Sequence, residues 1–316
     1  MTPDILRSKL AFDVRRGLTS EPRTLPPHIF YDRAGTLLFE QICHLPEYYV
    51  TKAERDIFVQ WADQMVDAFQ RVEHVIELGA GSAAKTGILL KSLIGRWPSA
   101  KYHPVDVSLE ALRIAVASLE LAMPMLRTCP HEGFYGEALH SLIHLEGRKL
   151  VMFIGSSIGN FEPREATAFL RDVRSSLKVG DILLLGADLP KSPSILIPAY
   201  DDPKGITAAF NKNALERINR EWGANFAPEL FEHVALWNKR ESRIEMHLES
   251  RNFQQVSIPG LDLQLGFEPG DRIHTENSYK YSQERLRHML RITGFQVVAD
   301  WRDRNGYFAD WLAQAV

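Results

Sequence analysis

Cysteine is scarce in this chain, and no stretch is dense in lysine and arginine. Only Cys43 and Cys129 occur in 316 residues, and they do not form a CxxC pair. This count excludes a disulfide framework and predicts a reducing compartment, so we expect a cytoplasmic protein. Lysine and arginine total 37 against 40 acidic residues, for a formal net charge of −3. Because binding to phosphates needs a basic surface, nucleic acid is not an expected partner.

A long apolar run is missing as well. Acidic and basic side chains interrupt the apolar positions of residues 1–18, which predicts an amphipathic helix and neither a signal peptide nor a membrane span. At 316 residues the chain exceeds the usual size of one hydrophobic core. We therefore expect a large α/β domain with an insertion, or two domains, in a monomer with no membrane partner.

Apolar strands alternate with helices between residues 71 and 190. Helical patterns separate the apolar runs HVIELGAG, KYHPVDVS, KLVMFIGSS and DILLLGADL. Strands that alternate with helices imply right-handed crossovers and a doubly wound parallel sheet. The runs are continuously apolar, as expected when helices cover both faces of the sheet. Residues 1–70 are helical in pieces with no clear strand, and we expect them to contribute to a substrate-binding region.

The alternation stops after residue 190. A helical pattern and two period-2 segments, RIEMHLES and NFQQVSI, predict an inserted α+β substrate-binding domain over residues 191–281. The sheet pattern resumes over 282–316, where the turn dipeptide Asn305–Gly306 predicts an antiparallel hairpin. A terminal antiparallel hairpin that closes a parallel sheet resembles the class I methyltransferase fold. Residues 71–190 and 282–316 would form its core.

The loop after the first strand of this core is the expected ligand site, because ligands bind at the carboxyl ends of the strands in open α/β sheets. Gly79 and Gly81 allow a sharp turn and a close approach of a ligand to the backbone. Asp106 ends the next strand and suits hydrogen bonds to ribose hydroxyls. Glu77 would repel a pyrophosphate and attract a sulfonium or an amino group. A plain tight turn with Glu77 at the strand end explains the same residues.

A resemblance to a known family rests on six blocks that occur in this order: YDRAGTLLFEQICHLPEYYVTKAE, IELGAGSAAKT, FIGSSIGNFEPREA, AYDDPKGITAAFNKN, RIEMHL and IHTENSYKYS. Together they resemble the histidine Nα-methyltransferases of ergothioneine biosynthesis. The similarity runs from about residue 27 to the C-terminus. It implies an enzyme that transfers three methyl groups from S-adenosylmethionine (SAM) to the α-amino group of L-histidine, giving hercynine.

The same resemblance implies the roles of individual residues. Tyr31 would lie near the reacting amino group, as the candidate catalytic residue and beside the cofactor. Residues expected to bind SAM are Glu77, Gly79, Gly81, Lys85, Asp106 and Glu137. Residues expected to bind histidine are Tyr48, Asn160, Tyr200, Met246, Glu276 and Ser278.

Chemistry supports two of these implied roles. Glu276 and Ser278 stand two residues apart on an extended segment, so their side chains point to the same side and can address both nitrogens of an imidazole. Tyr31 and Tyr48 present aromatic faces, which attract a quaternary ammonium product by cation–π interaction. The alternatives are that Glu276 is an ordinary carboxylate at the rim and that the tyrosines are interface aromatics.

One segment departs from the family pattern. Where the family has a Gly-Asp-Phe segment at the adenine, this chain is interpreted to have Gly136, Glu137 and Ala138, with Glu137 accepting from the adenine amino group. A metal is not expected, since His140 and His144 have the spacing of a ligand pair but no third ligand follows. Other functions compatible with the sequence are a methyltransferase for tryptophan or tyrosine, a nicotinamide oxidoreductase and a non-catalytic binding protein for an amino acid.

Overall fold

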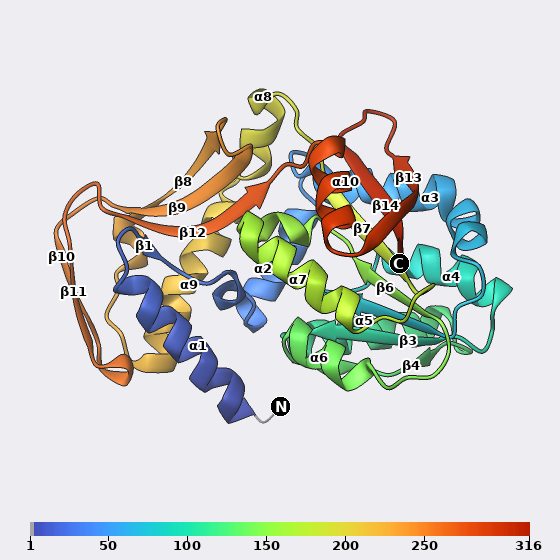
Figure 1. Cartoon of the computed structure of the whole chain (residues 1–316). Helices are drawn as coiled ribbons and strands as arrows, with labels where there is room; N and C mark the ends of the chain where they lie inside the picture. The colour runs from blue at the N-terminus through green and yellow to red at the C-terminus, as the bar shows by residue number, and fades with distance from the viewer. Residues whose placement is uncertain (1–2) are drawn as a thin grey trace. The chain divides into compact units, whose positions relative to one another are not determined.

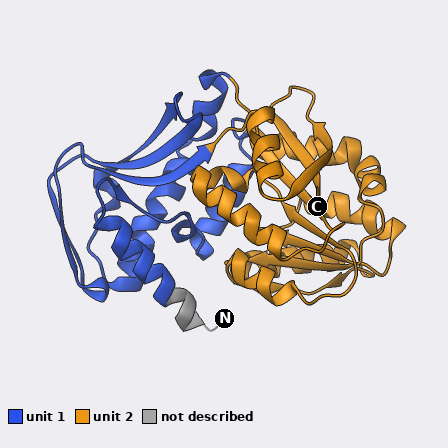
Figure 2. Cartoon of the chain, viewed as in Figure 1, with its two compact units in different colours: residues 1–48, 192–278 blue, residues 49–191, 279–316 orange. Residues whose placement is uncertain are grey.

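The computed structural model describes residues 3–316 (Figure 1), so the first two residues of the predicted N-terminal helix lie outside the described residues. The chain forms two compact units, drawn in blue and orange in Figure 2. Unit 1 comprises Met1–Tyr48 and Ser192–Ser278, and unit 2 comprises Tyr49–Lys191 and Tyr279–Val316. Within residues 3–316, no helix is long and apolar enough to span a membrane.

Unit 2 contains a doubly wound sheet with the strand order β13-β14-β7-β6-β2-β3-β4, and β5 also pairs with β3. The central strands β2, β3, β6 and β7 are parallel, whereas β14 is antiparallel to both β7 and β13. The predicted class I methyltransferase sheet with a terminal antiparallel hairpin is therefore confirmed. Its strands are β2 (His74–Leu78), β3 (Lys101–Asp106), β4 (Arg127–Thr128), β5 (His131–Glu132), β6 (Lys149–Phe153), β7 (Ile182–Asp188), β13 (Phe295–Arg302) and β14 (Phe308–Ala315).

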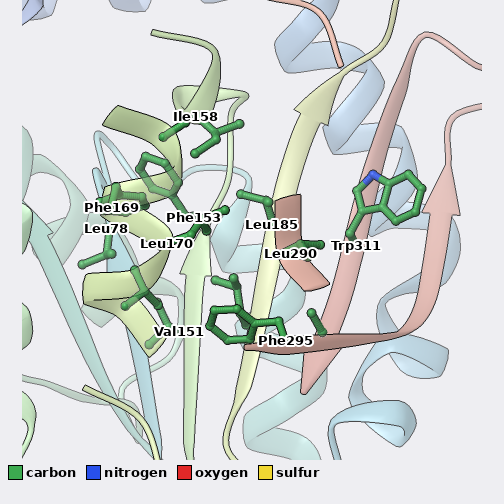
Figure 3. Close-up of a cluster of buried hydrophobic side chains, with 14 of the residues drawn as sticks. Leu78, Val151, Phe153, Ile158, Phe169, Leu170, Leu185, Leu290, Phe295 and Trp311 are labelled. Carbon is green, nitrogen blue, oxygen red and sulfur yellow. The ribbon is translucent and has the colours of Figure 1, made fainter. Parts of the chain in front are cut away.

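Helices cover both faces of this sheet. On one face α6 (Tyr135–Leu142), α7 (Pro163–Ser175) and α10 (Gln283–Ile292) bury a continuous apolar cluster with the strands. Figure 3 shows this cluster, in which side chains of the strands meet Phe169 and Leu170 of α7. Alternate strand residues such as Leu184 are also buried but belong to the other face. The helices α3 (Tyr49–Phe69), α4 (Thr86–Arg96) and α5 (Leu109–Ala122) also belong to unit 2.

The boundary of unit 2 falls before α3. The sequence interpretation grouped residues 49–70 with the N-terminal segment, whereas the structure groups them with the methyltransferase core. The reason is packing, because Ile57, Phe58 and Met65 of α3 are fully buried and the helix contacts α4, β7, β13 and β14. An amphipathic helix in the sequence does not reveal which sheet its apolar face covers.

Unit 1 combines the N-terminal segment and the insertion around one core. Its sheet has the order β1-β12-β9-β8, next to a β10–β11 hairpin. Helix α9 (Ile206–Trp222) contributes Phe210, Leu215 and Ile218 to a cluster that also contains Ile29 and Phe30 from the N-terminal segment. The other elements are α1 (Pro3–Leu18), β1 (Arg23–Thr24), η1 (Pro27–Phe30), α2 (Arg33–Cys43), α8 (Pro193–Leu196), η3 (Ile197–Ala199), η4 (Pro228–Leu230), β8 (Phe231–Asn238), β9 (Arg243–Ser250), β10 (Gln254–Ile258), η5 (Pro259–Leu261), β11 (Leu263–Phe267) and β12 (Arg272–Tyr279).

Three histidines form a chain across neighbouring strands of unit 2. His74 Nδ1 lies 3.0 Å from His103 Nε2, and His103 Nδ1 lies 3.1 Å from His131 Nε2. His74 Nε2 lies 3.0 Å from the carbonyl oxygen of Glu146, which can only accept. This contact fixes the direction of the hydrogen bonds among the three neutral rings. Each ring carries its proton on Nε2, and His74 and His103 accept on Nδ1.

Protonation of the histidine chain should destabilise the fold in acid. Burial and the neighbouring His74 and His131 lower the pKa of His103 to about 4, against 6.5 for an ordinary histidine. Between these values the unfolded chain binds the proton and the folded chain does not, so stability is lost as pH falls from 6.5 towards 4. His103 accounts for on the order of 3 kcal/mol of this loss. We expect His103→Gln to flatten the fall in unfolding free energy between pH 7.5 and pH 4.5, measured by urea titration; parallel curves for the two proteins would contradict this.

Candidate functional site

The glycine loop after β2 leaves open backbone at the carboxyl end of the sheet. Gly79 and Gly81 adopt φ angles of +76° and +52°, which residues other than glycine rarely adopt. No atom lies within 4 Å of the position that a Cβ at residue 81 would take. The loop stands where the strand order reverses, because β2 pairs with β3 on one side and with β6 on the other. This is the position at which open α/β sheets bind ligands.

Asp106, the last residue of β3, is tied to this loop. Its Oδ2 accepts the N–H of Gly81 at 3.0 Å, and its Oδ1 accepts the N–H of Ser108 at 2.8 Å. Burial raises the pKa of Asp106, and these backbone donors oppose the rise. A carboxylate has about four acceptor positions, so Asp106 can still accept a ligand hydroxyl. The structure therefore brings Asp106 and the glycine loop together, as the sequence predicts.

Glu77 lies beneath the loop. Its side chain accepts hydrogen bonds from the Thr86 hydroxyl at 2.6 Å and from the Tyr102 hydroxyl. Burial raises the pKa of Glu77 to about 7, against the effect of these donors and of Lys85. Each of its oxygens already has a protein partner, so Glu77 links β2 to α4 and β3.

Lys85 precedes α4 and pairs with a carboxylate that the sequence analysis missed. Its ammonium group donates to Glu54 of α3, which is fully buried. The other oxygen of Glu54 accepts the N–H of Gly155, in the loop after β6, at 2.7 Å. Glu54 thereby connects the start of α4 with the loop after the neighbouring strand. Asp310 of β14 is buried beside it, and burial together with the charge of Glu54 raises the pKa of Asp310 well above its ordinary value.

Removing the charge of Glu54 should weaken binding of SAM, the cofactor that the family resemblance implies. In Glu54→Gln the ammonium group of Lys85 loses its buried partner and no longer has a fixed position. We expect the dissociation constant for SAM to rise about tenfold, since a hydrogen bond to a charged group contributes about 1.5 kcal/mol. Isothermal titration calorimetry measures this directly on the folded variant. Asp67→Asn, which changes an exposed carboxylate on the same helix, is the control; equal SAM affinity in both variants would refute the role of Glu54.

An aromatic residue, Tyr135, lies beside the glycine loop, and the sequence analysis did not consider it. The hydroxyl of Tyr135 lies 2.9 Å from the position of a Cβ at Gly79, and Asp106 contributes, after burial, to raising the pKa of Tyr135. Glu137 lies exposed in the first turn of α6. Tyr135 thus directly precedes the segment Gly136–Ala138, which contains no aromatic residue.

The tyrosines expected to bind histidine gather in unit 1 around two phenylalanines. The ring centroid of Tyr31 lies 5.8 Å from that of Phe39 and 5.9 Å from that of Phe210. The ring of Tyr48 lies 6.3 Å from Phe39 and 6.1 Å from Tyr200, in both cases edge to face. These aromatics come from two separate stretches of the chain, residues 31–48 and 200–210, and the packing of α2 on α9 brings the stretches together.

Polar groups border this aromatic cluster. The hydroxyl oxygens of Tyr200 and Ser278 lie 2.7 Å apart and are buried. Burial raises the pKa of Tyr48 well above its ordinary value, and the charge of Glu276 adds to the rise. Met246 of β9 is buried, and its carbonyl oxygen accepts from the hydroxyl of Thr275 at 3.0 Å.

The structure thus assembles the predicted residues in two groups. Within unit 1 it brings together Tyr31, Tyr48, Tyr200, Glu276 and Ser278, with Met246 on a strand of the same sheet. Within unit 2 it brings together Glu77, Gly79, Gly81, Lys85 and Asp106, whereas Asn160 ends the 3-10 helix η2 (Ser157–Asn160) after β6. Among residues 3–316 no group of three or more His, Cys, Asp or Glu side chains is arranged to hold a metal ion.

A family model described as a histidine-specific, SAM-dependent methyltransferase matches residues 10–315. The chain belongs to this family. The histidine N-alpha-methyltransferase of Mycolicibacterium smegmatis is 40% identical over 99% of this chain and 97% of its own length. That of Mycobacterium tuberculosis is 38% identical over 95% of this chain and 93% of its own length. The 4-dimethylallyltryptophan N-methyltransferase of Claviceps purpurea is 25% identical over 94% of this chain and 92% of its own length.

Membership in the histidine-specific methyltransferase family confirms the expected enzyme class and its cofactor, SAM. It also excludes the nicotinamide oxidoreductase alternative. The geometry fits that cofactor, because an acid at the end of β3, an open glycine backbone and a partly exposed lysine paired with a buried glutamate occupy one end of the sheet. Glu54 could have been considered from the sequence, because it is the last residue of the first resemblance block. Its pairing with Lys85 could not, because the two residues are 31 positions apart.

Proposed function

We propose that this methyltransferase transfers three methyl groups from SAM to the α-amino group of L-histidine and so produces hercynine for ergothioneine biosynthesis. The main support is the cluster in unit 1, where the rings of Tyr48 and Tyr200 pack edge to face and the Tyr200 and Ser278 hydroxyls lie 2.7 Å apart, with Ser278 two residues along β12 from Glu276. Such a cluster combines polar groups suited to an imidazole with aromatic faces suited to a methylated amine.

The cofactor side of the proposal rests on unit 2. We assign the ribose hydroxyls to Asp106 and the close backbone approach to Gly79 and Gly81, which are free of side chains. Lys85, held by Glu54, supplies a positive charge that suits the carboxylate of SAM. When bound, SAM supplies a methyl group on a sulfonium, which is open to attack by a neutral amine.

The chain's own contribution to the reaction is to orient the amine. A free α-amino group has a pKa of about 8 and must be neutral to attack, so a path for its proton is required. We assign the orientation of the amine to the Tyr31 hydroxyl, and the carboxylate and amine of histidine to Tyr48, Asn160 and Tyr200. Alignment of the amine's lone pair with the bond from sulfur to methyl is the main source of rate enhancement in such a displacement.

Selection of histidine is assigned to Glu276 and Ser278, with Met246 beside the ring. A site built to satisfy both polar ends of an imidazole rejects side chains that lack them, because its own groups would stay unpaired. Glu77 and Glu137 have lesser parts in this proposal: Glu77 supports the loop from beneath, and Glu137 lies near the adenine end as an exposed acid.

A substrate panel tests this proposal. The purified protein and SAM are incubated with histidine, tryptophan, tyrosine and 4-dimethylallyltryptophan under identical conditions, and the products are measured by mass spectrometry. We expect a gain of three methyl groups on histidine alone. Methylation of a tryptophan derivative in preference to histidine would show that this chain is a tryptophan-type methyltransferase. Binding of histidine without turnover would indicate a non-catalytic protein.

We further infer that the protein works as a monomer in the cytoplasm, without nucleic-acid or membrane partners. The support is the low cysteine count, with only Cys43 and Cys129 in 316 residues and no CxxC spacing, together with the slight negative charge. Sedimentation at assay concentrations tests the oligomeric state, and a mass twice that of the chain would contradict it.

A further inference from the structure

One buried carboxylate in unit 2 holds three side chains. Asp188, the last residue of β7, is fully buried. The Tyr49 hydroxyl donates to its Oδ2 at 2.6 Å, and Lys280 Nζ lies 2.8 Å from the same oxygen. Lys191 Nζ donates to Oδ1 and also to the Tyr49 hydroxyl, the latter at 2.8 Å. The four side chains form one closed polar cluster.

The positions of these partners in the sequence are not random. The chain passes between the two units after Tyr48, after Lys191 and after Ser278. Tyr49 follows the first passage, Lys191 precedes the second and Lys280 closely follows the third. Asp188 therefore holds one residue at each point where the chain leaves or enters unit 2.

Further contacts within unit 2 fix the third passage. The Tyr281 N–H donates to the carbonyl oxygen of Asp188 at 2.9 Å, and the Tyr279 hydroxyl donates to Glu162 at 2.7 Å. A Cβ at Gly159 would meet the carbonyl oxygen of Tyr279 at 2.9 Å, so the two backbones are in direct contact. The residues that follow Ser278 are thus held by both backbone and side-chain contacts.

The two lysines of this cluster require Asp188 to be ionised. Two ammonium groups are buried around this single carboxylate. Burial alone would raise the pKa of Asp188, but Lys280 and Lys191 lower it further than burial raises it. Burial lowers the pKa of Lys191 to about 8, and the nearby Lys280 adds to this effect. Neutralising the carboxylate would remove the counter-ion that both buried ammonium groups share.

We propose that Asp188 is a positioning residue for methyl transfer, an inference that rests on the proposed histidine methylation. Tyr48 immediately precedes Tyr49, Ser278 stands just before Lys280, and Tyr200 lies on the segment that begins after Lys191. Each passage anchored by Asp188 therefore leads into a segment that carries proposed histidine-binding residues. Because Asp188 fixes the unit 2 end of each passage, it helps to position those residues for contact with the substrate.

The variant Asp188→Asn tests this role against a matched control. Asp181 is also a buried aspartate, lies immediately before β7 at its opposite end, and pairs with the buried Lys149 at 4.0 Å. Asp181→Asn therefore perturbs a similar ion pair far along the same strand from the passages. For each protein, SAM binding is titrated calorimetrically and kcat for histidine methylation is expressed per SAM-binding site.

We expect Asp188→Asn to bind SAM within threefold of the wild-type protein and to lose at least tenfold in kcat per SAM-binding site, while Asp181→Asn keeps kcat within twofold. An equal kcat in the two variants, or a loss that only follows the SAM-binding fraction, would overturn the proposal. If Asp188→Asn does not fold, Tyr49→Phe and Lys191→Met each remove one anchor, and unchanged kcat in both would overturn it equally. Wild-type protein without activity on histidine would instead refute the proposed function.

Discussion

Glu276→Ala is expected to lower kcat/KM for histidine about 100-fold while SAM binds as before. The reason is that the substitution leaves a ring nitrogen of the substrate without its partner, which costs roughly 2.7 kcal/mol of transition-state binding. The Ser278 hydroxyl still has Tyr200 as a neighbour, so the pocket keeps part of its polar border. Steady-state kinetics with histidine and with tryptophan measure the change, and activity on tryptophan should not fall.

Glu249→Ala supplies the control for this experiment. Glu249 lies on the same sheet and pairs with Arg272 at 2.6 Å, an ion pair with partly exposed side chains. Its loss should leave kcat/KM within twofold, because exposed pairs contribute little. A kcat/KM for histidine that stays within threefold in Glu276→Ala would remove Glu276 from the account of specificity.

Asp106→Ala is expected to raise the dissociation constant for SAM about 100-fold. The substitution removes the acceptors assigned to the ribose hydroxyls and releases the N–H groups of Gly81 and Ser108, which Asp106 now fixes. The dissociation constant of Asp106→Asn should lie between those of the wild-type protein and Asp106→Ala. An amide oxygen can still accept a hydrogen bond from one of these N–H groups. Calorimetric titration with SAM in the absence of histidine measures the effect independently of catalysis.

The exposed Glu132, which pairs with Asp106 in the register of β3 and β5, is the matched control. Glu132→Ala should bind SAM as the wild-type protein does. If Asp106→Ala and Glu132→Ala bind SAM with equal affinity and both remain folded, the ribose site lies elsewhere.

The parts of the fold that local pattern determines could be predicted from sequence. Continuous apolar runs such as β6 and β7 imply a sheet buried on both faces, and both strands are fully buried. The Asn305–Gly306 turn implies the hairpin, which the register of β13 and β14 confirms. The insertion of β14 between β7 and β13 could not be predicted, because pairing partners depend on the assembled sheet.

The candidate site divides in the same way. Gly79, Gly81 and Asp106 follow strands directly, so the sheet topology alone brings them together. Glu54 is separated from Lys85 by most of α3 and all of β2, and only the packing of α3 on α4 joins them. In the sequence Asp188 is simply an acid at the end of a strand. Its proposed role follows from the structure, where the distant Tyr49 and Lys280 join the nearby Lys191 around it.

The position and number of the added methyl groups distinguish trimethylation of the α-nitrogen from every other outcome. Histidine is incubated with the enzyme and SAM carrying a ¹³C-labelled methyl group, and the product is analysed by nuclear magnetic resonance. Trimethylation of the α-nitrogen predicts one labelled signal from three equivalent methyl groups, correlated with the α-proton. A labelled methyl group on an imidazole nitrogen, or no labelled histidine at all, would contradict it.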